Sequence, residues 1–360
     1  MVAGETGLAL EQQEIENTVN TLRQWTRSQL TSCSLAAHSL AVDNWQALGG
    51  DAGFRRYFRL HQTPLLAVWA PPATEKNREF VAIAEFLINA GLRAPRVFAF
   101  DSALGFLLIE DLGQQLYFDL LNGENADSLY NRAFDTLLQL HQAPVDSALF
   151  SPYSDSELNR ELNLFPQWFL ERMLGVVPPA AEQALLTEAF QLLCDNAHAQ
   201  PRVVVLRDFH SRNLIACDQN PPGVIDFQDG VAGPVTYDLV SLLRDCYVEW
   251  PDDRVDAWVE VFRQKAVVAG RLTDVTPEAF RRWFDLMGLQ RHLKVLGIFA
   301  RLALRDGKTA YLNDLPLVIR YVRRVAGRYE QLGAFHRWFE AQVMPRVATQ
   351  PWMTQTETVR

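Results

Sequence analysis

The chain has 360 residues, of which 48% are apolar, and its formal net charge is −9 at pH 7. This length and composition are typical of a globular protein with about two domains or lobes. The negative charge argues against broad binding to nucleic acid or to an anionic membrane, since both require a basic surface, and it favours a small-molecule partner.

Targeting and cysteine features predict a cytoplasmic protein with no membrane interaction. The segment 1–16 is acidic and lacks the basic and apolar blocks of a signal peptide, and no apolar run approaches the roughly 18 residues of a membrane span. The four cysteines lie far apart and form no paired metal-ligand spacing. We expect them to be reduced structural thiols.

The first third of the chain has the pattern of a small antiparallel sheet with one main helix. Runs of β-type residues, separated by turn residues, occupy 54–60, 64–69, 96–101 and 105–110. Residues 79–90 place apolar side chains on one helical stripe and end at Gly91, which suits a C-terminal cap. We place the end of this N-lobe at Asp111, so the predicted lobes are 1–111 and 112–360.

The second lobe is predicted to be larger and mainly helical. Apolar residues recur at helical spacing over 126–141 and through much of 155–200, 236–270 and 276–346. The exception is 203–229, where two short β-type runs flank a polar loop. The chain is therefore expected to have an α+β fold.

The polar loop carries the pattern on which the functional prediction rests. It reads Arg-Asp-Phe-His-Ser-Arg-Asn over 207–213, and the next strand is predicted to end with Ile-Asp-Phe over 225–227. This is the spacing of the catalytic loop and the metal-binding aspartate of protein kinases, although Leu206 replaces a histidine and Gln228 a glycine. The pattern and the order of the lobes predict a bilobal, protein-kinase-like fold.

Three residues of this pattern have chemistry that suits phosphoryl transfer. Such catalysis depends on orienting the acceptor hydroxyl and on neutralising phosphate charge with Mg²⁺. We expect Asp208 to orient the hydroxyl and accept its proton, and Asn213 and Asp226 to provide oxygen ligands for the metal. A polar β-hairpin in which Asp208 and Asn213 serve turns is the structural alternative.

Two further aspartates follow this pattern. Asp238 stands at a predicted helix start, where its carboxylate could cap the helix or anchor the catalytic loop. Asp229 could reach the metal shell or the substrate, or it could be a solvated turn residue.

The nucleotide site is predicted in the N-lobe. Gly49, Gly50 and Gly53 lie ahead of a β-type run, where kinases place a glycine-rich loop over the ATP phosphates, although the pattern is not G-x-G-x-x-G. Glu79 is the candidate for the ion pair that orients a phosphate-contacting lysine. The connector at Glu110 and Leu112 is expected to meet the adenine edge through its backbone; a plain core strand is the alternative.

The cation expected in the third strand is missing. Residues 65–70 contain neither lysine nor arginine, although an ordinary kinase carries its phosphate-binding lysine there. A nearby residue could supply the charge, and the candidates are Arg55, Arg56, Arg59 and Lys76. We include Arg55 in the predicted nucleotide site, but the sequence does not decide among the four.

These residues resemble the aminoglycoside phosphotransferase and choline kinase family. The family's His-Gly-Asp-x-His-x-x-Asn loop corresponds to 206–213, its metal aspartate to Asp226, and its Tyr-Asp-Leu turn to 237–239. The segments 50–59, 70–72 and 107–113 are similar to those of a branch that phosphorylates the anomeric C1 hydroxyl of N-acetylmuramate and N-acetylglucosamine in peptidoglycan recycling. The resemblance implies ATP and Mg²⁺ as cofactors, and a product that a sugar-1-phosphate nucleotidyltransferase consumes.

The predicted acceptor site includes a basic stretch. Residues 290–305 contain five basic residues and no acid, which disfavours a polycationic acceptor and suits the lactyl carboxylate of N-acetylmuramate. The candidates are Arg291, His292 and Arg301, with Asp229 as a further one. A solvated basic helix face is the alternative.

Two other functions remain open. Phosphorylation of an aminoglycoside, of choline or of another small molecule would use the same fold with a different acceptor pocket. A non-catalytic pseudokinase that serves as a binding module would account for the missing strand cation.

Overall fold

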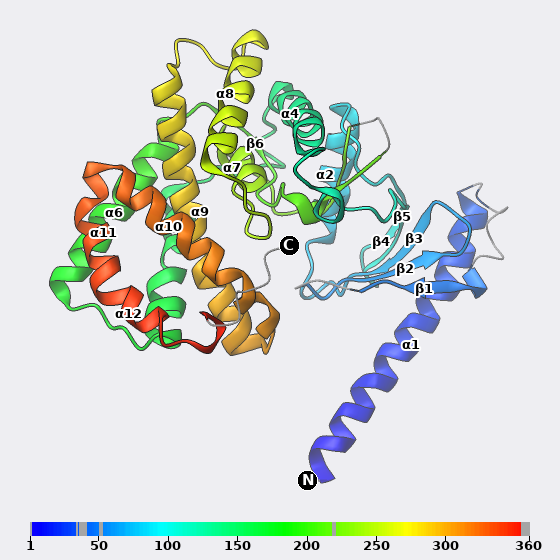
Figure 1. Cartoon of the computed structure of the whole chain (residues 1–360). Helices are drawn as coiled ribbons and strands as arrows, with labels where there is room; N and C mark the ends of the chain where they lie inside the picture. The colour runs from blue at the N-terminus through cyan, green and yellow to red at the C-terminus, as the bar shows by residue number, and fades with distance from the viewer. Residues whose placement is uncertain (1, 34, 36–41, 50–52, 218–220, 354–360) are drawn as a thin grey trace. The chain divides into compact units, whose positions relative to one another are not determined.

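The computed structural model describes residues 2–33, 35, 42–49, 53–217 and 221–353 (Figure 1). They form two compact units, each described by itself. Unit 1 comprises Met1–Gln115 and Ile215–Asp229, and unit 2 comprises Leu116–Leu214 and Gly230–Arg360. The first stretch of unit 1 thus extends four residues beyond the expected lobe boundary at Asp111, and a second, distant stretch joins it. The sheet of unit 1 and the helices of unit 2 confirm the α+β expectation.

The sheet of unit 1 is antiparallel throughout, with the strand order β1-β2-β3-β5-β4. Its strands are β1 (Trp45–Ala47), β2 (Arg56–Leu60), β3 (Leu65–Trp69), β4 (Val97–Asp101) and β5 (Phe106–Glu110). The last four coincide with the predicted β-type runs to within two residues at each end. The turn between β2 and β3 includes Gln62, whose φ of 55° is left-handed. This sheet positions the glycine-rich segment at the start of β2.

Two helices pack on this sheet. The sequence predicted only α2 (Asn77–Asn89), whose buried side chains include Phe80, Ile83 and Leu87. The other is α1 (Val2–Ser32), which contacts β3 and β5.

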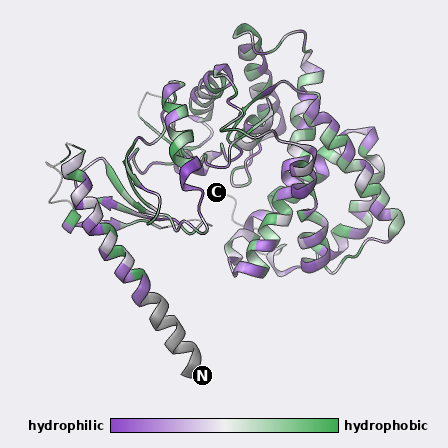
Figure 2. Ribbon diagram, turned by 180° about the vertical axis from the view of Figure 1, so that it is seen from behind, coloured by the Kyte–Doolittle hydropathy of each residue, from purple (hydrophilic) through white to green (hydrophobic). Residues whose placement is uncertain are grey.

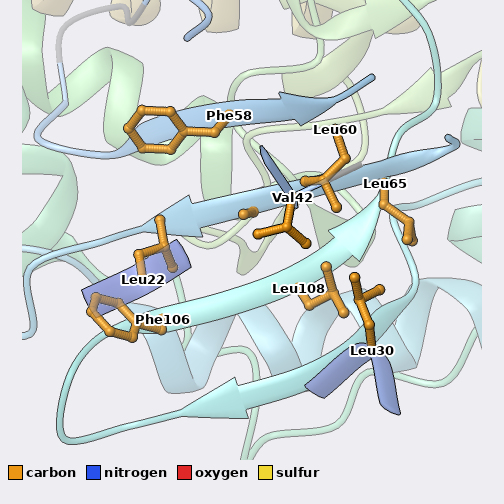
Figure 3. Packing of buried hydrophobic residues seen from close by; sticks show 9 residues of the cluster. Leu22, Leu30, Val42, Phe58, Leu60, Leu65, Phe106 and Leu108 are labelled. Atoms are coloured by element: carbon orange, nitrogen blue, oxygen red, sulfur yellow. The ribbon is translucent and has the colours of Figure 1, made fainter. Parts of the chain in front are cut away.

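One face of the sheet forms a hydrophobic core with α1. Figure 3 shows Leu22 next to Phe106 and Leu30 next to Leu108, and all four side chains are buried. The alternation of side chains along a strand explains this arrangement, since every second residue points to the same face.

Unit 2 is built mainly of helices, most of which carry both hydrophobic and hydrophilic residues (Figure 2). They are α3 (Tyr117–Leu120), α4 (Ala126–Gln142), α5 (Asp155–Leu162), α6 (Ala180–His198), α7 (Tyr237–Leu243), α8 (Asp252–Val268), α9 (Pro277–Asp306), α10 (Leu315–Arg328), α11 (Gly333–Trp338) and α12 (Met344–Val347), with a π-helical segment at Phe165–Met173. No helix among the described residues is both long and apolar enough to cross a membrane.

Helix α9 is the central element of unit 2. The Thr276 hydroxyl caps it by accepting a hydrogen bond from the Ala279 amide at 3.2 Å, and it ends at Gly307, whose φ is 68°. Gly297 allows close packing, because a Cβ there would lie 2.3 Å from the Leu164 carbonyl carbon. Most side chains of 284–300 are buried, so the basic residues of this stretch do not form a solvated face.

Two short ladders involve the strands that neighbour the polar loop in the sequence. Strand β6 (Arg202–Val205) pairs antiparallel with β9 (Val231–Pro234), and β7 (Leu214–Ile215) pairs with β8 (Gly223–Val224). The strands β6 and β8 therefore do not pair with each other. The polar loop between β6 and β7 is not the turn of a simple hairpin, which was the structural alternative for Asp208 and Asn213.

Candidate active site

The loop that carries Asp208 and Asn213 is closed on itself within unit 2. The Asn213 side chain donates from Nδ2 to the Asp208 carbonyl oxygen at 3.0 Å, and the His210 amide donates to the same oxygen at 3.0 Å. The Asn213 amide donates to the His210 carbonyl oxygen at 2.9 Å. Burial lowers the pKa of His210, so its imidazole is neutral near pH 7. The spacing of Asp208 and Asn213 is thus set by a hydrogen-bonded turn.

Two buried carboxylates anchor the backbone of this loop. Asp238, in the first turn of α7, accepts hydrogen bonds from the amides of Leu206 at 2.7 Å and Arg207 at 2.9 Å. Burial raises the pKa of Asp238 to about 7, although the two donors act in the opposite direction. Asp245 accepts from the Ser211 amide at 2.9 Å. The anchoring role considered for Asp238 is confirmed.

Arg207 adopts an unusual backbone conformation next to Asp208. Its φ is 75°, in the left-handed region that favours glycine, and the resembling family's loop motif has glycine at this position. Three contacts hold Arg207 in this conformation. Its amide donates to Asp238, its carbonyl oxygen accepts from the Ser241 hydroxyl at 3.1 Å, and its guanidinium pairs with Glu161 of α5.

Glu161 is the centre of a buried polar network that the sequence analysis missed. Its side chain pairs with Arg207 and, at 3.0 Å, with Lys294 of α9, and it accepts a hydrogen bond from the Tyr153 hydroxyl. Gln290 donates to the Tyr153 hydroxyl at 2.9 Å. The network holds the strained residue before Asp208 against two helices.

Replacing Glu161 with glutamine is expected to lower the free energy of unfolding by about 3–5 kcal/mol at pH 7, because it leaves two buried cations without their carboxylate. Urea unfolding followed by circular dichroism measures the change. Glu157→Gln is the matched control on the same helix, since Glu157 pairs with Arg160 at the surface and should cost at most about 1 kcal/mol. Equal losses for the two variants would contradict the role of the network.

The stability difference between the wild type and Glu161→Gln is expected to depend on pH. Burial alone would raise the pKa of Glu161, but the charges of Lys294 and Arg207 outweigh it and lower the pKa from 4.5 to about 2. A carboxylate with a lowered pKa stabilises the fold above its unfolded pKa and loses this contribution as the pH falls toward its folded pKa. The stability difference between the wild type and Glu161→Gln should therefore shrink below pH 4.5.

The predicted metal aspartate lies in unit 1. Asp226 follows β8, which ends at Val224, three residues before the expected end at Phe227. Its φ is 59°, and its Oδ1 accepts a hydrogen bond from Gln228 Nε2 at 2.7 Å. The next side chain, Phe227, is buried and stacks on Phe80 of α2, with ring centroids 5.0 Å apart. This stack fixes the segment that presents Asp226.

The donor set fits a magnesium ion. Asn213 and Asp226 offer amide and carboxylate oxygens, the ligands that Mg²⁺ prefers. The hydrogen bond from Asn213 Nδ2 to Asp208 sets the orientation of the amide. No cluster of three or more His, Cys, Asp or Glu side chains within the described ranges could hold a metal by itself, so the set would rely on Asn213. Asn213 belongs to unit 2 and Asp226 to unit 1, and their convergence stays a prediction.

Asp229 has a defined partner within unit 1. Its carboxylate pairs with Lys76, which directly precedes α2, at 2.6 Å, and both side chains are substantially exposed. This ion pair is compatible with both predictions for Asp229, a contact to the metal or substrate and a position in a turn.

The glycine-rich segment leads into β2. Gly49 and Gly53 flank it, whereas Gly50 lies outside the described residues. The Phe54 amide after this segment donates to Glu75 Oε1 at 2.8 Å. Glu79, the predicted ion-pair residue, lies on the exposed face of α2. The glutamate that contacts a buried cation is Glu75, which the sequence analysis did not consider.

The predicted adenine connector follows β5. Glu110 Oε2 accepts from the Arg96 amide at 3.3 Å, and Asp111 pairs with Arg59. Leu112 is buried against Gly223, where a Cβ would lie 2.9 Å from Leu112 Cδ1. Within unit 1 the connector therefore packs on the strand that leads to Asp226.

The basic acceptor candidates occupy different environments on α9. His292 is fully buried, its Nε2 lies 3.1 Å from the Arg244 carbonyl oxygen, and burial lowers its pKa to about 3. It is therefore neutral and carries no charge for a sugar carboxylate. Arg291 is buried and donates to Cys246 Sγ at 3.5 Å, whereas Arg301 is half-buried. The structure does not bring the three together as one cationic surface.

Comparison with known proteins identifies the family. Residues 44–271 match the model of the phosphotransferase enzyme family. The chain belongs to this family. It is 46% identical over 288 residues to an N-acetylmuramate/N-acetylglucosamine kinase of Pseudomonas putida, covering 79% of this chain and 84% of the relative. A Caulobacter vibrioides protein of the same name is 30% identical and covers 86% and 94% of the two chains.

Solved structures of phosphotransferases share the fold. A choline/ethanolamine kinase family protein from Mesorhizobium loti has a TM-score of 0.57 at 17% identity, covering 88% of this chain and 99% of that one. The ADP-bound aminoglycoside phosphotransferase APH(2'')-Ib has a TM-score of 0.54 at 16% identity, with coverage of 77% and 92%. The predicted kinase-like fold and enzyme class are confirmed.

Proposed function

We propose that this phosphotransferase transfers the γ-phosphoryl group of ATP to the anomeric C1 hydroxyl of N-acetylmuramate and N-acetylglucosamine. The observation that carries the proposal is the 46% identity to the Pseudomonas putida kinase over most of both chains. The hydrogen-bonded loop around Asp208 supports it, because retained catalytic geometry is not expected of a pure binding module.

The residues of the loop have distinct tasks in this proposal. Asp208 orients the C1 hydroxyl toward the γ-phosphorus atom and takes its proton as the bond from the C1 oxygen to phosphorus forms and the bond from phosphorus to the leaving ADP oxygen breaks. Asn213 and Asp226 would hold Mg²⁺, which would neutralise charge on the phosphates. Asp238 and Glu161 keep the loop backbone in place, so that Asp208 needs little reorganisation during the reaction.

The nucleotide site of the proposal lies in unit 1. The glycine-rich segment that includes Gly49 and Gly53 is proposed to cover the phosphates, and the connector at Glu110 and Leu112 is proposed to meet the adenine edge. The product is a sugar 1-phosphate, whose anomeric ester suits a nucleotidyltransferase as the next enzyme. The reaction is proposed for the cytoplasm, where ATP is available.

A panel of acceptors tests the proposed substrate. Mg²⁺–ATP is offered with N-acetylmuramate, N-acetylglucosamine, glucose, choline or kanamycin, and ADP release is followed together with ³¹P NMR of the product. We expect turnover and an anomeric phosphate signal with the two N-acetyl sugars. Turnover with kanamycin or choline alone would discard the proposed acceptor and keep the enzyme class, and no turnover with any acceptor would favour a binding module.

A further inference from the structure

Unit 1 contains a buried cation that the third strand does not provide. Strand β3 ends at Trp69 and has no basic residue, yet Arg55, directly before β2, is 9% exposed. Burying a guanidinium costs free energy unless the group is paired. The partners of Arg55 therefore indicate its role.

The contacts of Arg55 hold its guanidinium on an aromatic surface. Its Nε lies 3.3 Å from Glu75 Oε2, and the two side chains are 8% and 12% exposed. Its Nη2 donates to the Lys76 carbonyl oxygen at 3.5 Å, and its Cζ lies 4.8 Å from the ring centroid of Phe80. A guanidinium has five N–H donors in a rigid fork, so it can keep these contacts and also hold a phosphate oxygen.

Glu75 joins this cation to the glycine-rich segment. One carboxylate oxygen accepts from the Phe54 amide at 2.8 Å, and the other faces Arg55. A single side chain before α2 thus sets both the end of the segment and the position of the guanidinium. In an ordinary kinase the cation is a lysine on the third strand, and it pairs with a glutamate on the helix.

The aromatic surface below Arg55 continues toward Asp226. Phe80 contacts the guanidinium on one side and stacks on Phe227, the neighbour of Asp226 in the chain. Burial raises the pKa of the Tyr57 hydroxyl, and the charges of Arg55 and Asp226 both act on this group. The cation and the predicted metal ligand therefore belong to one packed cluster of unit 1.

The other three candidate cations have different partners. Arg59 pairs with Asp111 and donates to the Gly113 carbonyl oxygen at 3.1 Å, both in the connector. The ammonium of Lys76 pairs with Asp229 at 2.6 Å. Arg56 is exposed and lies over Trp69, with its Cζ 5.7 Å from the ring centroid.

We infer that Arg55 is the cation that contacts the phosphates of the nucleotide, and that Glu75 is the residue that positions it. The inference rests on the proposed function only in taking ATP as the nucleotide. It assigns Glu75, rather than Glu79, to the ion pair. Arg55 acts on the ligand directly, and Glu75 acts through Arg55.

Nucleotide binding measured without acceptor tests the assignment. Arg55→Gln, Arg55→Lys and Glu75→Gln are titrated with Mg²⁺–ATP and with adenosine by competition against a fluorescent nucleotide. We expect Arg55→Gln to weaken ATP binding about 10- to 100-fold, as for the loss of a charged hydrogen bond, and to leave adenosine binding unchanged. Arg55→Lys should recover part of the loss, and Glu75→Gln should weaken ATP binding less than Arg55→Gln does.

Arg56→Gln is the matched control, because it removes the same charge from the adjacent, exposed position. Unchanged ATP affinity in Arg55→Gln, or an equal fall for ATP and adenosine, would overturn the inference. If Arg55→Gln does not fold, Arg55→Lys decides, since a selective loss of ATP over adenosine supports the assignment and wild-type affinity contradicts it. A wild type that binds ATP but phosphorylates no amino sugar would refute the proposed function alone.

Discussion

Replacing Asp208 with alanine is expected to lower kcat by about 10²–10⁴-fold, the usual contribution of a positioned general base. Affinity for Mg²⁺–ATP should stay close to that of the wild type, because Asp208 acts on the acceptor hydroxyl. The Asp208 carbonyl, which accepts from Asn213 and His210, is backbone and remains in the variant. The loop geometry should therefore survive the substitution. Steady-state kinetics with N-acetylmuramate and a separate ATP titration measure the two effects.

Asp253→Asn provides the control for Asp208. This aspartate is exposed in the first turn of α8 in the same unit, and its replacement should leave kcat unchanged. Wild-type turnover in Asp208→Ala would remove Asp208 from the chemistry. A parallel loss of ATP affinity would mean that the substitution disturbs the loop rather than the proton transfer.

Replacing Asp226 with asparagine should weaken Mg²⁺-dependent binding of ATP by about 100-fold or more, since a metal at the phosphates contributes several kcal/mol. Asparagine is a more selective substitution than alanine at this position. Its shape matches aspartate and it tolerates the left-handed backbone, so the φ of 59° at this position remains accessible. The substitution thus removes charge without adding backbone strain. Isothermal titration with and without Mg²⁺ gives the metal-dependent part.

Glu85→Gln is the corresponding control in unit 1, because Glu85 is exposed on α2 and loses the same charge. Its ATP affinity should equal that of the wild type. Normal Mg²⁺-dependent affinity in Asp226→Asn would exclude Asp226 from the metal site. A loss that persists without Mg²⁺ would instead assign Asp226 a direct role in nucleotide binding.

The regular elements near the site followed from local sequence patterns. Strands β2 to β5 and helix α2 lie where alternation, turn residues and the apolar stripe predicted them. Helix α1 was missed although Ile15, Val19, Leu22 and Leu30 show helical spacing from its middle onward. The polar residues in the first half of the helix made this pattern hard to recognise.

The sequence by itself was enough to predict the chemistry of the candidate site, because the types and spacing of Asp208, Asn213 and Asp226 are local features of the chain. The tertiary structure decided which charges support them. Glu161 is separated from Arg207 by 46 positions and from Lys294 by more than a hundred, and only the packing of α5 on α9 brings them together. Likewise, no local pattern distinguishes Glu75 from Glu79. Their roles differ because the fold buries Arg55 beside one of them and turns the other toward solvent.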